Sequence, residues 1–407
     1  MACATHSAPA TRPALEVADI VRARQSEYRD SHPVYGQHDR VLRALVNCRT
    51  AGLGGYKAQC DSCGHVAIQY ASCRNRHCPK CQTLAGTRWV ERQCADLLDI
   101  DYWHLVFTLP HDLNPLAQSH PRLVYNLLFK AASRTLLEFG RNPRWLGGEL
   151  GVTMVLHTWG QNLGAHIHVH CIVTGGALSA DRQHWIPSSR GFLFPTAALS
   201  KVFRGKYLDG LAKARRAGEL QSGGAQARLL DDPLAFECLI TRLRSHDWVV
   251  YAKAPFSGAA NVLAYLGRYT HRVAIANHRL TDFDGKHVHF RWRDYAHGNK
   301  NKVMSLTADE FIRRFLLHTL PRGLARIRHY GLLANRSRQK NLSHCRELVG
   351  QPKPERRKTE SIDEMMLRLT GIDVTQCPRC EHGRLRRTTI VNPLATRTLT
   401  HDSTGPP

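Results

Sequence analysis

Residues 166–176 read HIHVHCIVTGG, in which histidines alternate with apolar residues. Successive side chains of a β-strand point to opposite faces, so the alternation predicts a strand with His166, His168 and His170 on one face. Imidazoles lined up in this way need a ligand or water to satisfy their nitrogens. We therefore predict that His168 and His170 bind one divalent cation. The alternative interpretation is a row of stacked surface histidines.

Strand and helix patterns alternate on both sides of this stretch. Patterns of period two, typical of strands, occur at residues 102–109, 151–158, 166–175 and 247–256. Amphipathic helix patterns lie between them, at residues 115–139 and 194–218. The resulting β-α-β-β-α-β order is the split βαβ plan of ferredoxin-like domains. The predicted fold class is therefore α+β, with helices on one face of an antiparallel sheet.

A helix carrying two tyrosines is predicted directly after the fourth strand, at residues 263–274, LAYLGRYTHRVA. Residues four apart share one face of a helix, so Tyr265 and Tyr269 present two phenols side by side. Such a pair is more often a packing feature, but Arg268 and Arg272 beside it can hold phosphates and stabilise charge on phosphorus. With the helix lying across the histidine strand, the combination predicts phosphoryl transfer on DNA.

This chemistry needs a metal or a cationic neighbour that favours the phenolate, because a phenol with a pKa of about 10 is a weak nucleophile at neutral pH. Mg²⁺ or Mn²⁺ held by His168 and His170 would polarise the scissile phosphate and offset its developing charge. Two histidines do not complete an octahedral shell. Gln161, in the loop before the histidine strand, is the predicted third protein ligand.

The charge balance indicates a polyanionic partner. The chain has 57 Lys and Arg residues against 33 Asp and Glu residues, for a formal net charge of +24. No long apolar run predicts a membrane span, and the N-terminal stretch lacks the apolar core of a secretory signal. We expect a cytoplasmic protein associated with the nucleoid. The predicted DNA-contacting residues are Arg74, Arg76, Arg268, Arg272, Arg291 and Arg293.

Two Cys-x-x-Cys pairs predict zinc binding, since thiols in a reducing compartment are more often ligands than disulfides. Cys60 and Cys63 precede Cys78 and Cys81 with the spacing of a zinc ribbon, in which each pair directs two thiolates at the same tetrahedral ion. A redox pair is the alternative. The loop between the pairs contains further candidate ligands, namely Cys73, His65 and His77.

Farther along the chain, a third pair, Cys377 and Cys380, has no downstream Cys-x-x-Cys partner. His382 or His401 can complete a site there, so whether this pair binds a second zinc stays open. The patterns also predict short helices at residues 308–320 and 323–331, a strand at 286–295, and disorder after about Thr388. We divide the chain into an N-terminal helical and zinc-binding module (1–97), a catalytic domain (98–330) and a basic C-terminal region with a partly disordered tail (331–407).

Taken together, these motifs resemble a known family. A series of segments within residues 42–349 is similar to the rolling-circle transposases of insertion-sequence family ninety-one, the two-tyrosine branch of the HUH endonucleases. The segments include, in this order, FTLPHDLN, VHCIVTGGALS, YLGRYTHRVAI and RSRQKNLSHCREL. The resemblance implies a ferredoxin-like HUH endonuclease domain preceded by a small helical zinc-ribbon-like module. It also implies that His168 and His170 bind the metal and that Tyr265 and Tyr269 are the nucleophiles.

The resemblance further implies that the chain nicks and rejoins single-stranded DNA at insertion-sequence ends and target sites through a 5′-phosphotyrosine. Its partners would be that DNA and host replication proteins. The chain departs from the family pattern at His166, where a proline is expected just before the motif, and this leaves His166 as a competing ligand. Rival interpretations are a plasmid replication initiator or relaxase with the same chemistry, and a non-catalytic zinc-containing DNA-binding protein.

Overall fold

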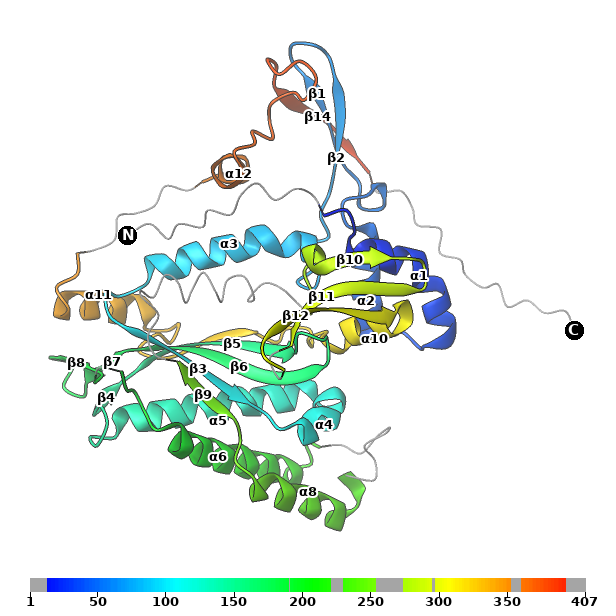
Figure 1. The fold of residues 1–407 in the computed structure, drawn as a ribbon. Helices are drawn as coiled ribbons and strands as arrows, with labels where there is room; N and C mark the ends of the chain where they lie inside the picture. Colours follow the sequence, from blue (N-terminus) through cyan, green and yellow to red (C-terminus); the bar gives the residue numbers. More distant parts are fainter. Residues whose placement is uncertain are drawn as a thin grey trace, which may run out of the picture.

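The computed structural model describes residues 13–189, 191–220, 230–253, 274–294, 297–352 and 360–392. Its centre is a five-stranded sheet in which every neighbouring pair of strands is antiparallel (Figure 1). The strands lie in the order β13 (Ile327–Gly331), β5 (Gly151–Trp159), β6 (Ala165–Thr174), β3 (Tyr102–Thr108) and β9 (Val250–Lys253). The histidine strand β6 is therefore the middle strand, with a partner along each edge.

Helices cover one face of this sheet (Figure 1). They are α4 (Asn114–Ser119), α5 (Pro121–Arg141), α6 (Thr196–Arg216) and α8 (Pro233–Ser245). Phe107 of β3 and Val169 of β6 are fully buried against these helices in the largest hydrophobic cluster. Because side chains alternate along a strand, His168 and His170 project from the opposite face. A mixed helix-and-sheet architecture is thus confirmed.

The opposite face of the sheet is covered at one end by α3 (Pro79–Ala95), whose Trp89 packs against Tyr102 and Ile172. Next to it, α11 (Arg338–Leu348) packs against a small three-stranded sheet made of β4 (Gly148–Glu149), β7 (Gly176–Ser179) and β8 (Trp185–Pro187). Within the part of the chain that the structure describes, no helix is both long and apolar enough to span a membrane.

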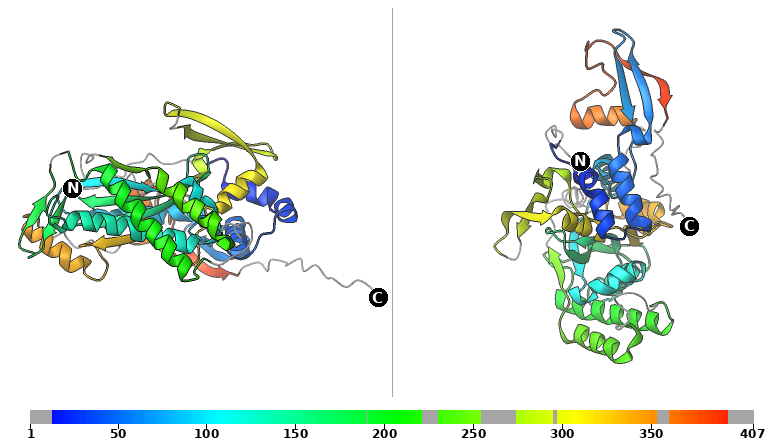
Figure 2. Two further views of the ribbon diagram at one scale, coloured as in Figure 1. Left: turned by 90° about the horizontal axis from the view of Figure 1, so that it is seen from below. Right: turned by 90° about the vertical axis from the view of Figure 1, so that its right-hand side faces the viewer.

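A second hydrophobic core joins two helices near the N-terminal end to residues 280–317. It lies between α1 (Val17–Ser31), α2 (Gly36–Asn47), α10 (Ala308–Leu317) and a three-stranded arm made of β10 (Leu280–Phe283), β11 (His287–Asp294) and β12 (Lys300–Thr307). Phe290 of β11 packs there beside Phe311 of α10. The arm projects from the body, as the view from below shows (Figure 2).

A third unit combines residues 55–70 with residues 362–391, which are far apart in the sequence. The strands β14 (Leu385–Val391), β1 (Gly55–Cys60) and β2 (Val66–Tyr70) form a sheet in that order at the top of Figure 1, beside α12 (Ile362–Thr370). We call this unit the ribbon. Among the described residues, short 3-10 helices lie at Ala51–Leu53, His111–Leu113 and Asn277–Arg279.

One prediction about the C-terminal half is wrong. The helix predicted at residues 323–331 is in its second half the strand β13, because that segment pairs with the open edge of β5. The tail predicted to be disordered begins within β14, which runs to Val391 and pairs with β1, and residues 393–407 of that tail lie outside the described residues. The C-terminal region predicted from residue 331 onward also supplies β14 to the sheet of the N-terminal module.

Candidate functional site

Strand pairing brings a third histidine to the two predicted ligands. In the register of the sheet, His168 of β6 lies opposite His157 of β5, and His170 lies opposite the neighbouring Val155. Directly opposed residues of antiparallel strands project from the same face, so the rings of His157, His168 and His170 share one surface. We call this surface the histidine face.

The two predicted ligands point their Nε2 atoms at each other. The Nδ1 atom of His168 lies 2.9 Å from the carbonyl oxygen of His166, so this nitrogen donates a proton and Nε2 keeps a lone pair. The Nδ1 atom of His170 lies 2.9 Å from Nε2 of His104. The Nε2 atoms of His168 and His170 are 3.1 Å apart. Two nitrogens at that separation can both lie at about 2.1 Å from one cation.

His157 completes a group of three. One ligand nitrogen from each of His157, His168 and His170 lies within 4.8 Å of the other two. The His157 ring centroid is 4.4 Å from that of His170 and 5.3 Å from that of His168. The residues therefore fit a divalent cation. His157 is not among the predicted ligands although it lies in a predicted strand, because the register between strands decides which side chains meet.

Burial keeps these imidazoles neutral. It lowers the pKa of His168 to about 3, and it holds the pKa values of His157 and His170 well below their usual range. The buried ring of His104 has a pKa of about 4 for the same reason. Neutral imidazoles offer lone pairs at physiological pH, which is the state that binds a metal.

Two other candidate ligands, Gln161 and His166, precede His168 in the chain. Gln161 is in the turn between β5 and β6, where its backbone carbonyl accepts a 2.6 Å hydrogen bond from Arg279. The His166 ring is 4.8 Å from the His168 ring and 5.6 Å from that of His111. The convergence of imidazoles favours His157 over Gln161 as the third ligand.

The predicted nucleophiles cannot be placed against this face. Tyr265, Tyr269, Arg268 and Arg272 belong to residues 254–273, which lie outside the described residues. The strand before them, β9, carries an exposed tyrosine, Tyr251, opposite Val106 of β3, which in turn lies opposite His170. Tyr251 therefore projects from the histidine face, which makes it a suitable control position for testing whether Tyr265 and Tyr269 are the nucleophiles.

A cationic side chain also lies beside the histidine face. The Arg326 guanidinium is 5.7 Å from the ring of Trp159, and it contributes to the low pKa of His157. Burial lowers the pKa of Arg326 to about 9, which leaves it charged at neutral pH. A half-buried guanidinium of this kind can attract a phosphate.

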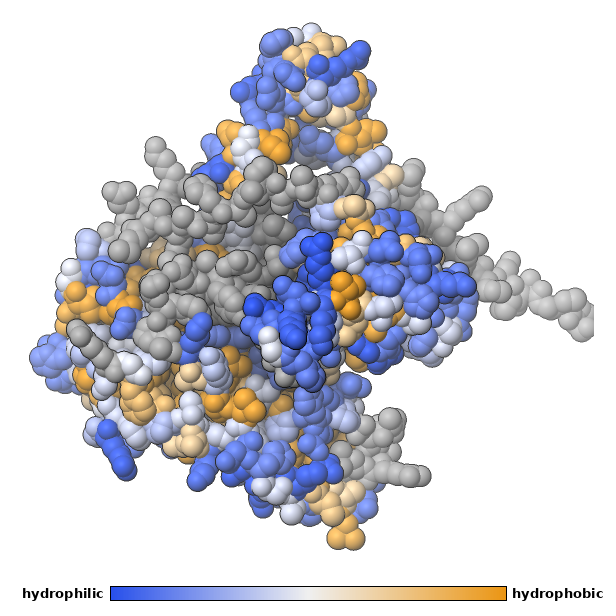
Figure 3. All heavy atoms as spheres, in the orientation of Figure 1, coloured by the Kyte–Doolittle hydropathy of each residue, from blue (hydrophilic) through white to orange (hydrophobic). Residues whose placement is uncertain are grey.

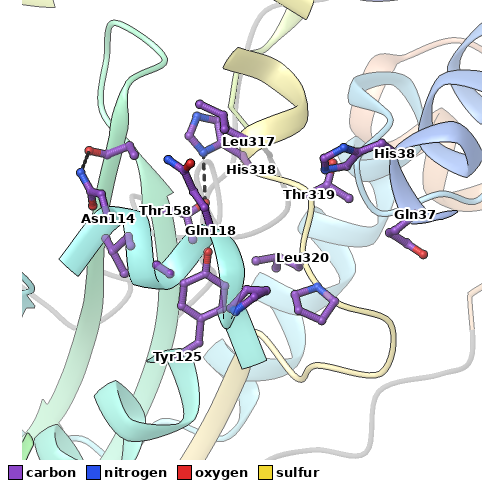
Figure 4. Close-up of a pocket in the computed structure, with 15 residues that line it drawn as sticks. Gln37, His38, Asn114, Gln118, Tyr125, Thr158, Leu317, His318, Thr319 and Leu320 are labelled. Carbon is purple, nitrogen blue, oxygen red and sulfur yellow. Dashed lines mark hydrogen bonds between the residues drawn. The ribbon is translucent and has the colours of Figure 1, made fainter. Parts of the chain in front are cut away.

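A cavity of about 440 Å³ opens on the other side of β6, among polar side chains of α2, α4, α5 and the segment after α10 (Figure 4). Ile167 of β6 lines it, while its neighbour His168 faces away from it. His318 closes one wall, with its ring between the Thr158 hydroxyl and the Leu163 carbonyl. β6 therefore separates this cavity from the histidine face.

The first thiol cluster differs from the predicted zinc site. Cys78 and Cys81 lie beside Cys48, at the end of α2, and Cys73. The Sγ atoms of Cys48 and Cys81 are 3.5 Å apart, and those of Cys73 and Cys81 are 3.6 Å apart. Hydrogen bonds from the three neighbouring thiols, led by Cys48, hold the pKa of Cys81 well below its usual range. We call this group the core cluster, because it borders the core around α1 and α2.

The other predicted pair, Cys60 and Cys63, lies instead beside Cys377 and Cys380. The prediction that Cys60, Cys63, Cys78 and Cys81 share one ion is therefore wrong. The physical reason is that β14 pairs with β1 and so carries its own Cys-x-x-Cys pair to the tip of the ribbon. Cys48 and Cys73 then complete the tetrad around Cys78 and Cys81, and of these two only Cys73 had been considered as a ligand.

The predicted DNA-contacting arginines fall into two kinds. Arg291 and Arg293 are exposed on the arm, where the surface is hydrophilic (Figure 3), and Arg74 is exposed next to the core cluster. Arg76 instead donates hydrogen bonds to the backbone carbonyls of the segment after α10, which belong to Leu320, Pro321 and Leu324. Those bonds make Arg76 a structural residue.

Comparisons with known proteins agree on one kind of protein. Residues 151–341 match a family model described as "Putative transposase", and residues 20–109 match one described as "Transposase zinc-binding domain". The chain is 48% identical over 374 residues to "Putative transposase y4qJ" of Sinorhizobium fredii (strain NBRC 101917 / NGR234), covering 91% of this chain and 94% of that protein. It is 27% identical over 299 residues to "Transposase for insertion sequence element IS801" of Pseudomonas savastanoi pv. phaseolicola, covering 73% and 70%. No solved structure matches the chain.

Proposed function

We propose, because this chain belongs to the transposases of insertion-sequence family ninety-one and carries their zinc-binding domain near its N-terminal end, that it nicks and rejoins single-stranded DNA in rolling-circle transposition. The observation that carries the proposal is the convergence of His157, His168 and His170 on one sheet face. Neutral imidazoles whose Nε2 atoms lie 3.1 Å apart suit a metal that activates a phosphate.

The sheet order supports assigning the catalytic domain to the ferredoxin-like HUH endonucleases. The strands β3, β5, β6 and β9 correspond to the first, second, third and fourth strands of the predicted series, and they lie in the order fourth, first, third, second. Each helical connection therefore joins strands that are separated by one antiparallel strand, as a split βαβ unit requires. The metal-binding histidines then lie on a central strand.

The three imidazoles favour Mn²⁺ over Mg²⁺ among the two predicted ions. Mg²⁺ prefers oxygen ligands and gives up its water reluctantly, whereas a softer divalent ion accepts nitrogen more readily. When bound, the ion would polarise the scissile phosphate. The protein's part is to hold His168 and His170 in orientation through the hydrogen bonds at their Nδ1 atoms.

The nucleophile in this proposal is Tyr265 or Tyr269. The phenolic oxygen forms a bond to phosphorus while the bond from phosphorus to the 3′ oxygen breaks, which leaves a 5′-phosphotyrosine and a 3′ hydroxyl. The link conserves the energy of the phosphodiester, so rejoining needs no ATP. A second tyrosine allows a second strand to be cleaved while the first link persists. Arg326 is a candidate for holding the phosphate.

Binding of the polyanionic substrate is assigned to the basic surface. The net charge of +24 and the exposed Arg74, Arg291 and Arg293 support single-stranded DNA as the partner, together with host replication proteins. We assign zinc to the core cluster as a structural ion, since four thiolates at these distances match tetrahedral coordination. A DNA-acting enzyme of this kind would work in the cytoplasm at the nucleoid.

The test is cleavage of labelled single-stranded DNA that carries the sequences flanking this protein's own gene. With Mn²⁺, the wild type should form a denaturant-resistant adduct with the fragment whose 5′ end is created by the nick. The doubly substituted Tyr265→Phe, Tyr269→Phe protein should form none. Tyr251→Phe is the matched control and should form the adduct normally, because Tyr251 lies on β9 rather than on the predicted helix.

His168→Ala should reduce cleavage by at least about 100-fold while DNA binding is retained, because binding depends mainly on phosphate contacts. An adduct that survives in the double tyrosine variant, or one lost only in Tyr251→Phe, would move the nucleophile elsewhere. Binding without cleavage by the wild type would favour a non-catalytic DNA-binding protein. Cleavage without strand joining at a second site would favour a replication initiator or relaxase.

A further inference from the structure

We propose that Cys60, Cys63, Cys377 and Cys380 bind a second zinc ion, which fastens the C-terminal segment to the N-terminal hairpin. The two cysteine pairs are more than 300 residues apart in sequence and meet at the tip of the ribbon. The proposal is independent of the transposition chemistry, because none of these four cysteines belongs to the histidine face. The segment that carries Cys377 and Cys380 also lies outside both regions matched by family models.

The distances between sulfur atoms fit a tetrahedral ion. Cys60 Sγ and Cys380 Sγ are 3.7 Å apart, and Cys63 Sγ and Cys377 Sγ are also 3.7 Å apart. One zinc ion with four thiolates at about 2.3 Å requires edges of about 3.8 Å between sulfurs. All four sulfurs lie within 4.8 Å of one another. The separations are much longer than a disulfide bond, for which about 2.05 Å is expected.

Both pairs are built as the same kind of turn. Backbone N–H groups of Ser62 and Cys63 donate to Cys60 Sγ at 3.4 Å. In the other turn, the N–H of Arg379 donates to Cys377 Sγ at 3.5 Å, and that of Gly383 donates to Cys380 Sγ at 3.4 Å. Hydrogen bonds to sulfur favour the thiolate, which is the form that binds zinc.

Gly383 is required by the close approach of the two turns. A Cβ atom at this position would overlap the Cys60 Sγ atom and the Ser62 side chain. The turns are also joined by Asp61, whose carboxylate accepts a 2.7 Å hydrogen bond from the Arg384 N–H and pairs with Arg386 at 3.0 Å. These contacts hold the two cysteine pairs face to face.

The ribbon lacks the hydrophobic core that would stabilise it without a metal. Among the described residues of β1, β2 and β14, the buried side chains are those of Ala58 and Cys60. Ile68 and Ile390 are 51% and 79% exposed. A sheet of this size that buries so little apolar surface needs a cross-link, and a structural zinc ion supplies one.

The experiment is a count of zinc per full-length chain, purified under reducing conditions and measured by elemental analysis. The wild type should contain one zinc ion more than the Cys377→Ser, Cys380→Ser variant, because the core cluster and the histidine face are the same in both proteins. Cys238→Ser is the matched control, since this exposed cysteine lies on α8 outside both clusters, and it should contain as much zinc as the wild type. Equal zinc contents in the wild type and the double variant would overturn the proposal.

A second variant covers the case in which the double variant does not fold. Gly383→Ala keeps every thiol, so it should retain the zinc of the core cluster and lose the second zinc to a chelator at least about 10-fold faster than the wild type. Titration of the metal-free wild type with Co²⁺ gives an independent count, because each Cys₄ site produces a thiolate charge-transfer band. Saturation at one equivalent would contradict the proposal. These measurements do not depend on DNA cleavage, so they separate its failure from that of the proposed function.

Discussion

At the scale of single residues, His104 positions one of the metal ligands. Its Nε2 atom lies 2.9 Å from Nδ1 of His170, and the two rings are stacked with centroids 5.1 Å apart. Partners of this kind fix the tautomer and the orientation of a ligating imidazole. The role is one of support, since the three converging ligand nitrogens come from His157, His168 and His170.

His104→Phe should therefore weaken Mn²⁺ binding by about 10- to 100-fold, because the ring of His170 loses the hydrogen bond at Nδ1. His104→Gln can restore that bond through its terminal amide and should recover part of the affinity. Calorimetric titration with Mn²⁺ measures both changes. If His104→Phe bound Mn²⁺ as tightly as the wild type, the hydrogen bond would have no positioning role.

Arg76 has a structural role instead of the predicted contact with DNA. A basic residue beside a zinc module suggested a phosphate contact, yet its guanidinium donates to the carbonyls of Leu320, Pro321 and Leu324. Desolvation lowers its pKa, which reflects its enclosed position. The residues that remain candidates for DNA contact are the exposed ones, such as Arg74.

At the scale of elements, β11 separates two functions between its faces. Val288 and Phe290 point into the core around α10, whereas Arg291 and Arg293 lie on the opposite, exposed face of the strand. Because the arm projects from the body, these guanidinium groups are available to a backbone of phosphates.

The Arg291→Gln, Arg293→Gln variant should weaken binding of single-stranded DNA of any sequence and flatten its dependence on salt. Each lost phosphate contact should reduce the slope of log K against log salt by about 0.7. Arg216→Gln, on the exposed side of α6, is the matched control and should leave the slope unchanged. Fluorescence anisotropy at several salt concentrations measures the slopes, and equal slopes for all three proteins would exclude the arm from the DNA-binding surface.

At the scale of the whole molecule, buried neutral histidines join its parts. His318 links the end of α10 to the turn between β5 and β6 through the Leu163 carbonyl, at 2.9 Å, and burial lowers its pKa to about 4. His329 links β13 to Thr153 of β5, at 3.0 Å, and burial likewise lowers its pKa to about 4. The unfolded chain therefore binds protons at a pH where these folded rings do not.

The free energy of unfolding should accordingly keep its full value above pH 6.5, which is about the pKa of a histidine in the unfolded chain. It should fall as the pH drops from 6.5 toward 4. For His318 the loss at pH 5 amounts to about 2 kcal/mol in the free energy of unfolding. Urea unfolding at pH 7.5 and pH 5 measures it. The His318→Gln protein, which cannot titrate at this position, should lose less stability between the two pH values. An identical loss in both proteins would show that His318 does not carry the effect.

Local patterns in the sequence predict the strands β3, β5, β6 and β9 and the three Cys-x-x-Cys pairs, and a series of motifs along the chain predicts the family. The strands and the cysteine pairs depend on local periodicity or on spacing within about ten residues, which the chain displays directly. The positions of β3, β5 and β6 follow the predicted ranges closely for that reason. The tyrosine assignment stays a prediction.

Which distant residues meet depends on how the strands pair in the folded protein. The register of β5 on β6 brings His157 to His168, and a different register would have brought another side chain. The pairing of β14 with β1 divides the predicted zinc site into the core cluster and a second tetrad that includes Cys377 and Cys380. Contacts between segments far apart in the chain depend on packing and hydrogen bonding among all the elements, and no local pattern in the sequence encodes them.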